Sequence, residues 1–247
     1  MSDYNGRYPG AIPANADMSV DAGLRAFMLQ VYNKLGIGLA LAGALSWVVG
    51  NVPEVTQLFF TVSGNTLRPT ILGLAVQWAP LVVLLGAMFT MKNPTSRGAS
   101  LLYWVVVALI GLSLGYIFLI YTGASVASTF FITAASFGGL SLVGYTTKKD
   151  LSGFGSFLIM GVIGIIIASI VNMFLNSPML YFIINVVGVL VFAGLIAYDT
   201  QKLKMTYYAA GGNPAILGPA SSYGALSLFL DFVNLFLFLL RLFGSRR

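Results

Sequence analysis

The sequence contains neither cysteine nor histidine. Without cysteine the chain can form no disulfide and carry out no thiol chemistry. The absence of both residue types removes the usual ligands of zinc, haem and iron–sulfur sites. Any bound metal ion is therefore expected to be held by oxygen, which points to calcium, magnesium or a monovalent ion. Because histidine is the usual group that titrates near neutral pH, carboxylates are the groups expected to sense pH within this chain.

Charged residues are also scarce. They make up 8% of the 247 residues, whereas hydrophobic residues make up 58% and the mean hydropathy is +0.90. A soluble domain carries about 25% charged residues. The composition therefore predicts an all-α polytopic membrane protein whose first partner is the lipid bilayer. The net charge of +6 does not indicate nucleic-acid binding, because the basic residues form short clusters between apolar runs.

A polar tail precedes the apolar segments. Residues 1–24 are rich in Gly, Pro, Asn and Asp and lack the apolar run of a signal peptide, so a flexible tail is expected there. Residues 25–247 are expected to form one domain of seven transmembrane helices. Residues 53–69 are expected to rest as an amphipathic segment on the outer membrane surface. The seven crossings are expected at about 27–52, 71–91, 99–120, 124–145, 154–175, 179–198 and 224–244, and a Gly/Pro-rich linker, Ala209 to Ser222, is expected before the last.

Basic residues orient these crossings. With the N-terminus inside, the only basic residue on the outer side before the last helix is Arg68. This bias follows the positive-inside rule, and Lys34 is expected to snorkel to the inner surface. The C-terminal arginines lie outside if the last helix crosses and inside if it re-enters, and its apolar length favours a crossing. The inner segments then hold Arg7, Arg25, Lys34, Lys92, Arg97, Lys148, Lys149, Lys202 and Lys204.

The last apolar segment carries Asp231 at bilayer depth. An aspartate there costs about 2.5–3.5 kcal/mol on insertion scales, so its side chain is expected to face protein or water. Helical rotation aligns it with Asn234, Phe238 and Arg241 on one stripe. A helix with one polar stripe among Leu and Phe belongs at the centre of a bundle. The alternative role of Asp231 is a packing hydrogen bond to a neighbouring helix.

The second acidic group near membrane depth is Asp199, at the expected end of the sixth crossing. It either pairs with Lys202 three residues on, or it meets Asp231 within hydrogen-bond reach, directly or through one water. Two carboxylates in a low dielectric cannot both ionise cheaply, so such a pair shares a proton. When deprotonated it could ligate a hard cation such as calcium. Asn172, Asn185 and Asn234 either line a polar path or make helix-packing contacts.

Three runs of the chain, in this order, carry a resemblance to a known family: Phe137 to Ser152, Ala197 to Gln201 and Ser227 to Leu235. They resemble the Bax inhibitor-1 family, also called the transmembrane Bax inhibitor motif family. The resemblance covers nearly the whole chain from the first helix onward. It implies seven helices with the C-terminal helix central, in a bacterial inner membrane. It also implies a pH-sensitive calcium leak gated by an aspartate pair, which maps onto Asp199 and Asp231.

Two further features come from the resemblance. Family members that gate in this way use a basic residue of the second helix as a latch, and the nearest candidate here is Lys92. A lysine lacks the planar fork of arginine and would make a weaker latch. Bacterial members are also linked to a membrane-bound protease.

Three functions therefore stand open. The first is a cation leak channel without enzymatic activity or cofactor, and the second is a membrane regulator that binds a membrane protease or another partner. The third is an intramembrane aspartyl protease, in which paired carboxylates would activate water. The third is disfavoured because Asp231 lies in a Leu-Asp-Phe setting, without the Gly-x-Gly-Asp and Pro-Ala-Leu motifs of such proteases.

Overall fold

The structure, a computed structural model, describes residues 21–63, 66–91 and 94–247. The flexible tail predicted before residue 21 lies outside these residues. Nearly all of the described chain is helical, which confirms the predicted fold class. The elements are α1 (Ala22–Asn51), α2 (Pro53–Phe59), β1 (Phe60–Ser63), β2 (Thr66–Pro69), α3 (Ile71–Thr90), α4 (Ser96–Ser113), α5 (Tyr116–Ile120), α6 (Gly123–Thr146), α7 (Ser152–Leu175), α8 (Pro178–Ala209) and α9 (Pro214–Phe243).

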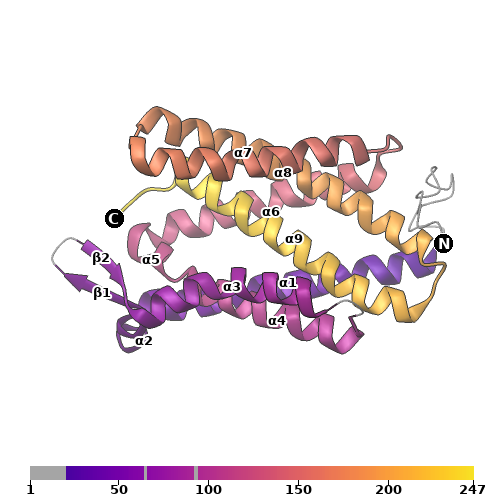
Figure 1. Ribbon diagram of the computed structural model, residues 1–247, viewed down its shortest axis with the longest axis horizontal. Coiled ribbons are helices and arrows are strands. Elements are labelled where there is room, and N and C mark those ends of the chain that lie inside the picture. The colour runs from indigo at the N-terminus through magenta and orange to yellow at the C-terminus, as the bar shows by residue number, and fades with distance from the viewer. Residues whose placement is uncertain (1–20, 64–65, 92–93) are drawn as a thin grey trace.

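Within the described residues, seven helical segments are long and apolar enough to cross a membrane, with α4 and α5 forming one of them. Their number agrees with the sequence prediction. Helix α1 starts at the end of the bundle that we call the inner end, and the β1–β2 hairpin and the C-terminus lie at the opposite, outer end (Figure 1). The first helix is capped by Asp21, whose carboxylate accepts a hydrogen bond of 2.9 Å from the Leu24 N–H. This hydrogen bond lowers the pKa of Asp21, so the cap is ionised at neutral pH.

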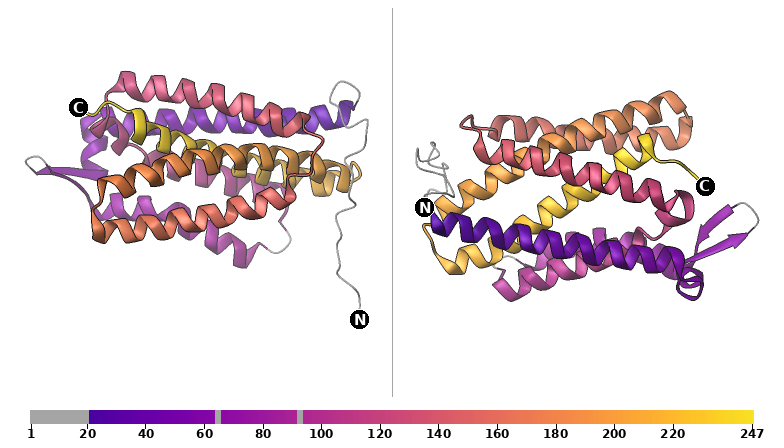
Figure 2. Two further views of the ribbon diagram at one scale, coloured as in Figure 1. Left: turned by 90° about the horizontal axis from the view of Figure 1, so that it is seen from above. Right: turned by 180° about the vertical axis from the view of Figure 1, so that it is seen from behind.

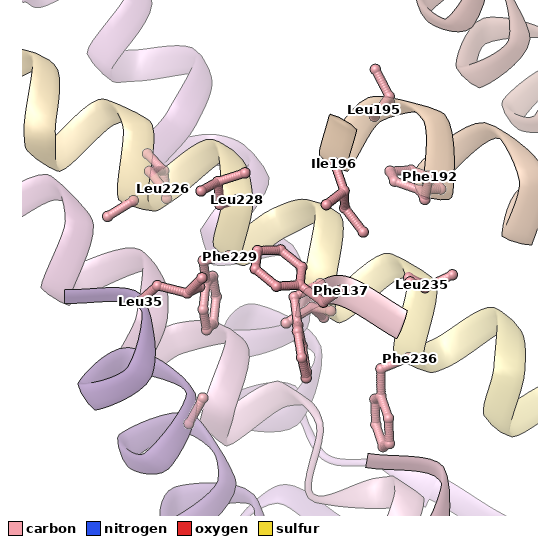
Figure 3. Packing of buried hydrophobic residues seen from close by; sticks show 14 of the residues in the cluster. Leu35, Phe137, Phe192, Leu195, Ile196, Leu226, Leu228, Phe229, Leu235 and Phe236 are labelled. Carbon is pink, nitrogen blue, oxygen red and sulfur yellow. The ribbon is translucent and has the colours of Figure 1, made fainter. Parts of the chain in front are cut away.

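Helix α9 is the central helix. It runs diagonally between the group α7–α8 and the group α1, α3 and α4, as Figures 1 and 2 show, and it packs against α1, α4, α6 and α8. Helices α3 and α7 lie further out, against α4 and α8. Apolar side chains of α9 fill the space between its neighbours (Figure 3), among them Leu228, Phe229, Leu235 and Phe236. The sequence prediction of a central last helix is confirmed.

The last two spanning helices are longer than their apolar segments. Helix α8 continues for eleven residues beyond Tyr198, and α9 begins at Pro214 within the stretch interpreted as a linker. The reason is that hydropathy detects only the apolar part of a helix, whereas polar helical turns can extend beyond it. As a result, Asp199 lies within α8 and not at its end.

The outer loop and the third crossing also differ in detail from the prediction. The amphipathic segment is helical only from Pro53 to Phe59, after which β1 and β2 form an antiparallel hairpin. The third crossing breaks after α4, where Gly115 lies against Val49 of α1. Gly111 likewise lies against the backbone of Ala42, so this glycine pair permits the close contact between α1 and the third crossing that its spacing predicts.

The C-terminal residues confirm that the last helix crosses. After α9 ends at Phe243, the chain pairs with the turn between α5 and α6 at the outer end. The N–H of Arg247 donates to the carbonyl of Ile120 at 2.9 Å, and the N–H of Thr122 donates to the carbonyl of Ser245 at 3.0 Å. The C-terminal arginines therefore lie at the end opposite to the start of α1.

Gly144 offers a test of the helix packing. A methyl group on Gly144 would overlap the carbonyl oxygen of Ala197 in α8, whereas a methyl group on Gly139 of the same helix would meet no atom within 4 Å. We expect Gly144→Ala to destabilise the protein by about 1–3 kcal/mol through overpacking. Gly139→Ala should be neutral or stabilising, because alanine favours a helix over glycine. Thermal unfolding of the two variants in detergent measures this difference, and equal unfolding temperatures would contradict it.

Candidate functional site

Asp231 lies in the middle of the central helix, about 26 Å along α9 from Pro214 at 1.5 Å per residue. Only 6% of its surface is exposed. Its Oδ2 atom is buried and has no hydrogen-bond partner within the described chain. A buried carboxylate oxygen without a partner is costly in its charged form, so this residue needs a proton, a cation or water.

Asp199 faces Asp231 from helix α8, nearer to the inner end. It is half-buried and lines a cavity of about 140 Å³ between α8 and α9. Lys202 and Thr206 of α8 line the same cavity, as does Ser227 of α9. The hydroxyl of Ser227 lies beside the Asp199 carboxyl, and Lys202 is the nearby positive charge. The expected interaction between Asp199 and Lys202 is therefore electrostatic, and both residues lie within α8 and not at its end.

The two aspartates belong to one site at the contact between α8 and α9. Ser227, which lies beside Asp199, is one helical turn before Asp231 on α9. The negative charge of Asp199 also acts electrostatically on Asp231. No hydrogen bond directly joins the two carboxylates in the described residues. The cavity at Asp199 is not lined by Asp231. Neighbouring residues of α9, including Phe229, Phe232 and Leu235, belong to the buried apolar core, so Asp231 lies deeper in the bundle than the cavity at Asp199.

The three asparagines lie at different depths. Asn234 is one turn beyond Asp231, and its amide donates to the Leu230 carbonyl at 2.8 Å. Asn185 is about 21 Å from Asp199 along α8; its amide donates to the Tyr181 carbonyl at 2.7 Å, and its Oδ1 atom is buried without a described partner. Asn172 is in the outer turn, where it accepts a hydrogen bond from the Ser177 N–H at 3.0 Å. Only Asn234 is close in sequence to either aspartate. That the three asparagines line a polar path through the bundle stays a prediction.

Lys34 is a residue whose partners the sequence analysis missed. It was expected to snorkel to the inner surface, and its ammonium donates to Ser222 at 2.7 Å and to Ser221 at 3.1 Å. Its carbonyl also accepts a hydrogen bond of 2.6 Å from the Tyr103 hydroxyl. Both serines belong to the inner half of α9, so the direction toward the inner surface stays a prediction, whereas the two hydroxyl partners were not predicted. Lys34 thus ties α1 to the inner half of α9.

A second polar connection was also missed. The hydroxyls of Tyr32 in α1 and Ser141 in α6 are hydrogen-bonded, and Ser141 in turn bonds Thr200 in α8 at 3.1 Å. Thr200 follows Asp199 directly. Serine and threonine give little signal in a sequence because most of them bond the carbonyl four residues back in their own helix.

Helix α8 is fixed at its inner end through Gln201. The amide nitrogen of Gln201 donates to the carbonyl of Lys149 at 2.8 Å, and its amide oxygen accepts from the N–H of Leu151 at 2.8 Å. The side chain is completely buried. The loop between α6 and α7 is thereby held against α8. Lys34 in turn holds α9 to α1, and the hydroxyls of Tyr32, Ser141 and Thr200 connect α1 to α6 and α8.

The described residues contain no cluster of three or more His, Cys, Asp or Glu side chains that could hold a metal ion. Calcium prefers six to eight oxygen ligands. The aspartate pair could supply only part of such a set, with Ser227 and water as additional ligands. The candidate latch Lys92 lies outside the described residues.

These features define an integral membrane protein with a central helix and a buried acidic pair. The chain belongs to the Bax inhibitor-1 family: residues 24–247 match the family described as "Inhibitor of apoptosis-promoting Bax1". A protein of Caulobacter vibrioides is 60% identical over the full length of both chains. Inner membrane protein YbhL of Escherichia coli is 46% identical over 92% of this chain and 94% of its own. A Rickettsia prowazekii protein, RP147, is 44% identical over 92% of each chain. The predicted family and inner-membrane location are thus confirmed.

Proposed function

We propose that this protein is a pH-sensitive cation leak channel of the bacterial inner membrane, with calcium as the permeant ion and the Asp199–Asp231 pair as its gate. It acts without a cofactor and without enzymatic activity. The observation that carries the proposal is the buried Oδ2 of Asp231, which has no hydrogen-bond partner among the described residues and lies within electrostatic range of the Asp199 carboxylate.

The pair supports a switch through elementary electrostatics. With one proton between them, the two groups carry a single negative charge and can share a hydrogen bond, directly or through water, that ties α8 to α9. When both are ionised, they repel one another unless a cation compensates. The two protonation states therefore favour two arrangements of the same helix contact.

The surroundings of the pair support a gate at this place. The inner cavity of about 140 Å³ reaches Asp199 and holds polar groups on both helices. Beyond it the central helix is packed in apolar side chains. A small separation of α8 and α9 would extend the cavity from Asp199 to Asp231, and the cation would replace the missing partner of Oδ2.

The proposal is tested by calcium flux into liposomes that contain only the purified protein, measured across a pH series from 5 to 8. Protein-free liposomes are the control. Flux that changes with pH supports the channel. Absence of flux at every pH, with a membrane protease that co-purifies, would instead favour a regulator that binds a protease. Cleavage of a transmembrane peptide substrate would favour an aspartyl protease.

A further inference from the structure

A second polar cavity lies at the outer end of the bundle, away from the aspartate pair. It has a volume of about 270 Å³ and is formed where α5, the first turn of α8, the last turn of α9 and the C-terminal residues meet. Its polar lining consists of two arginines and three tyrosines, namely Arg241, Arg246, Tyr116, Tyr121 and Tyr181. No acidic side chain lines it.

Both arginines are exposed at this end of the bundle, and neither has an acidic side chain beside it in the cavity. The guanidinium of Arg241 lies over the ring of Phe238, 5.6 Å from its centroid, and beside the hydroxyl of Tyr116. Arg246 is positioned by an antiparallel backbone bridge to Tyr121. Neither arginine forms an ion pair with another residue of the described ranges. Two positive charges thus share one concave surface that no acidic side chain lines.

We propose that this cavity binds a phosphate-bearing anion, whether the headgroup of a membrane lipid or free phosphate. Guanidinium groups bind phosphate oxygens through paired, charge-assisted hydrogen bonds, and the tyrosine hydroxyls supply further donors. The cavity is larger than a phosphate group. Its tyrosines also lie at helix ends on the outer side, which is the depth at which tyrosine rings meet lipid headgroups.

The anion would join segments that are far apart in the chain. Arg241 belongs to the central helix, Arg246 to the C-terminal residues, Tyr116 to α5 and Tyr181 to α8. An anion bound to the arginines and to the tyrosine hydroxyls would therefore connect the outer end of α9 to α5 and α8. Since a ligand that binds only the folded protein raises its stability, the site predicts stabilisation by the anion. This inference is independent of the aspartate pair.

The test uses the full-length protein, stripped of lipid in a non-ionic detergent, with thermal unfolding as the readout. One arm titrates inorganic phosphate against chloride at equal ionic strength. The other arm titrates phosphatidylglycerol and counts retained lipid by native mass spectrometry. Stabilisation by inorganic phosphate identifies a free anion as sufficient, and stabilisation by the lipid alone identifies a headgroup. We expect Arg241→Gln/Arg246→Gln to weaken binding at least about tenfold, as the loss of charge-assisted bonds predicts.

Arg247→Gln is the matched control, because Arg247 is adjacent and exposed but does not line the cavity. It should bind like the wild type. Arg246→Gln alone replaces the double variant if the latter does not fold, since Arg246 is exposed and beyond the last helix. The proposal is overturned if neither phosphate source stabilises the protein, if the cavity variants retain full binding, or if Arg247→Gln weakens binding equally.

Discussion

Replacement of both Asp199 and Asp231 by asparagine is expected to remove most of the pH dependence of calcium flux. Asparagine keeps the size of each side chain but cannot change its charge. One pKa unit corresponds to about 1.4 kcal/mol, so a change of this size shifts a balanced two-state gate roughly tenfold. The double variant should lose that tenfold change across the pH series, whatever its absolute flux. Flux into liposomes from pH 5 to 8 measures it.

Asp150 provides the matched control for this experiment. It lies in the inner loop before α7, and its carboxylate accepts a hydrogen bond of 2.8 Å from the Ser152 N–H. Hydrogen bonds from the Ser152 side chain and backbone lower the pKa of Asp150, so it stays ionised throughout the series. Asp150→Asn should therefore keep the wild-type pH profile. If the double variant of the pair kept that profile as well, the carboxylates would not be the sensor.

The seven crossings could be predicted from the sequence because a membrane-spanning helix requires a long run of apolar residues. The sequence also identified Asp199 and Asp231, since charged groups at bilayer depth are rare and expensive. The depth of Asp199 within α8 was not predictable from hydropathy, because the inner turns of that helix are polar. The β1–β2 hairpin was missed for a related reason: the helical spacing of Val55, Leu58 and Phe59 continued to Val62, although the helix stops at Phe59.

The tie between Lys34 and α9 could not be predicted from the sequence in the same way. An ammonium in a membrane helix is usually explained by snorkelling, and its partners here are two serines. Those serines occur in a stretch rich in Gly and Pro, which resembled a linker. A cation with neutral partners leaves no pattern of opposite charges to detect. Only the packing of α1 against α9 brings these three side chains together.

This tie leads to a prediction with a large expected effect. Lys34→Met should raise calcium flux at the pH where the wild type is closed, and the pH dependence should remain. The two hydrogen bonds from Lys34 connect α1 to α9, and hydrogen bonds to charged groups contribute about 1.5–3 kcal/mol each. If they exist only in the closed arrangement, losing one such bond shifts a two-state gate by about tenfold or more. Flux at fixed pH and a full pH series measure the two parts of the prediction.

Two further variants separate this tie from a general loss of stability. Ser221→Ala/Ser222→Ala removes the acceptors and should reproduce the raised flux, because it breaks the same contact from the side of α9. Asn33→Ala changes the exposed neighbour of Lys34 and should leave flux unchanged. If Lys34→Met abolished the pH dependence, Lys34 would belong to the sensor itself. If Lys34→Met altered neither the flux nor its pH profile, the tie between α1 and α9 would not control the gate. The two helices would then move together during opening, and only α8 would separate from α9.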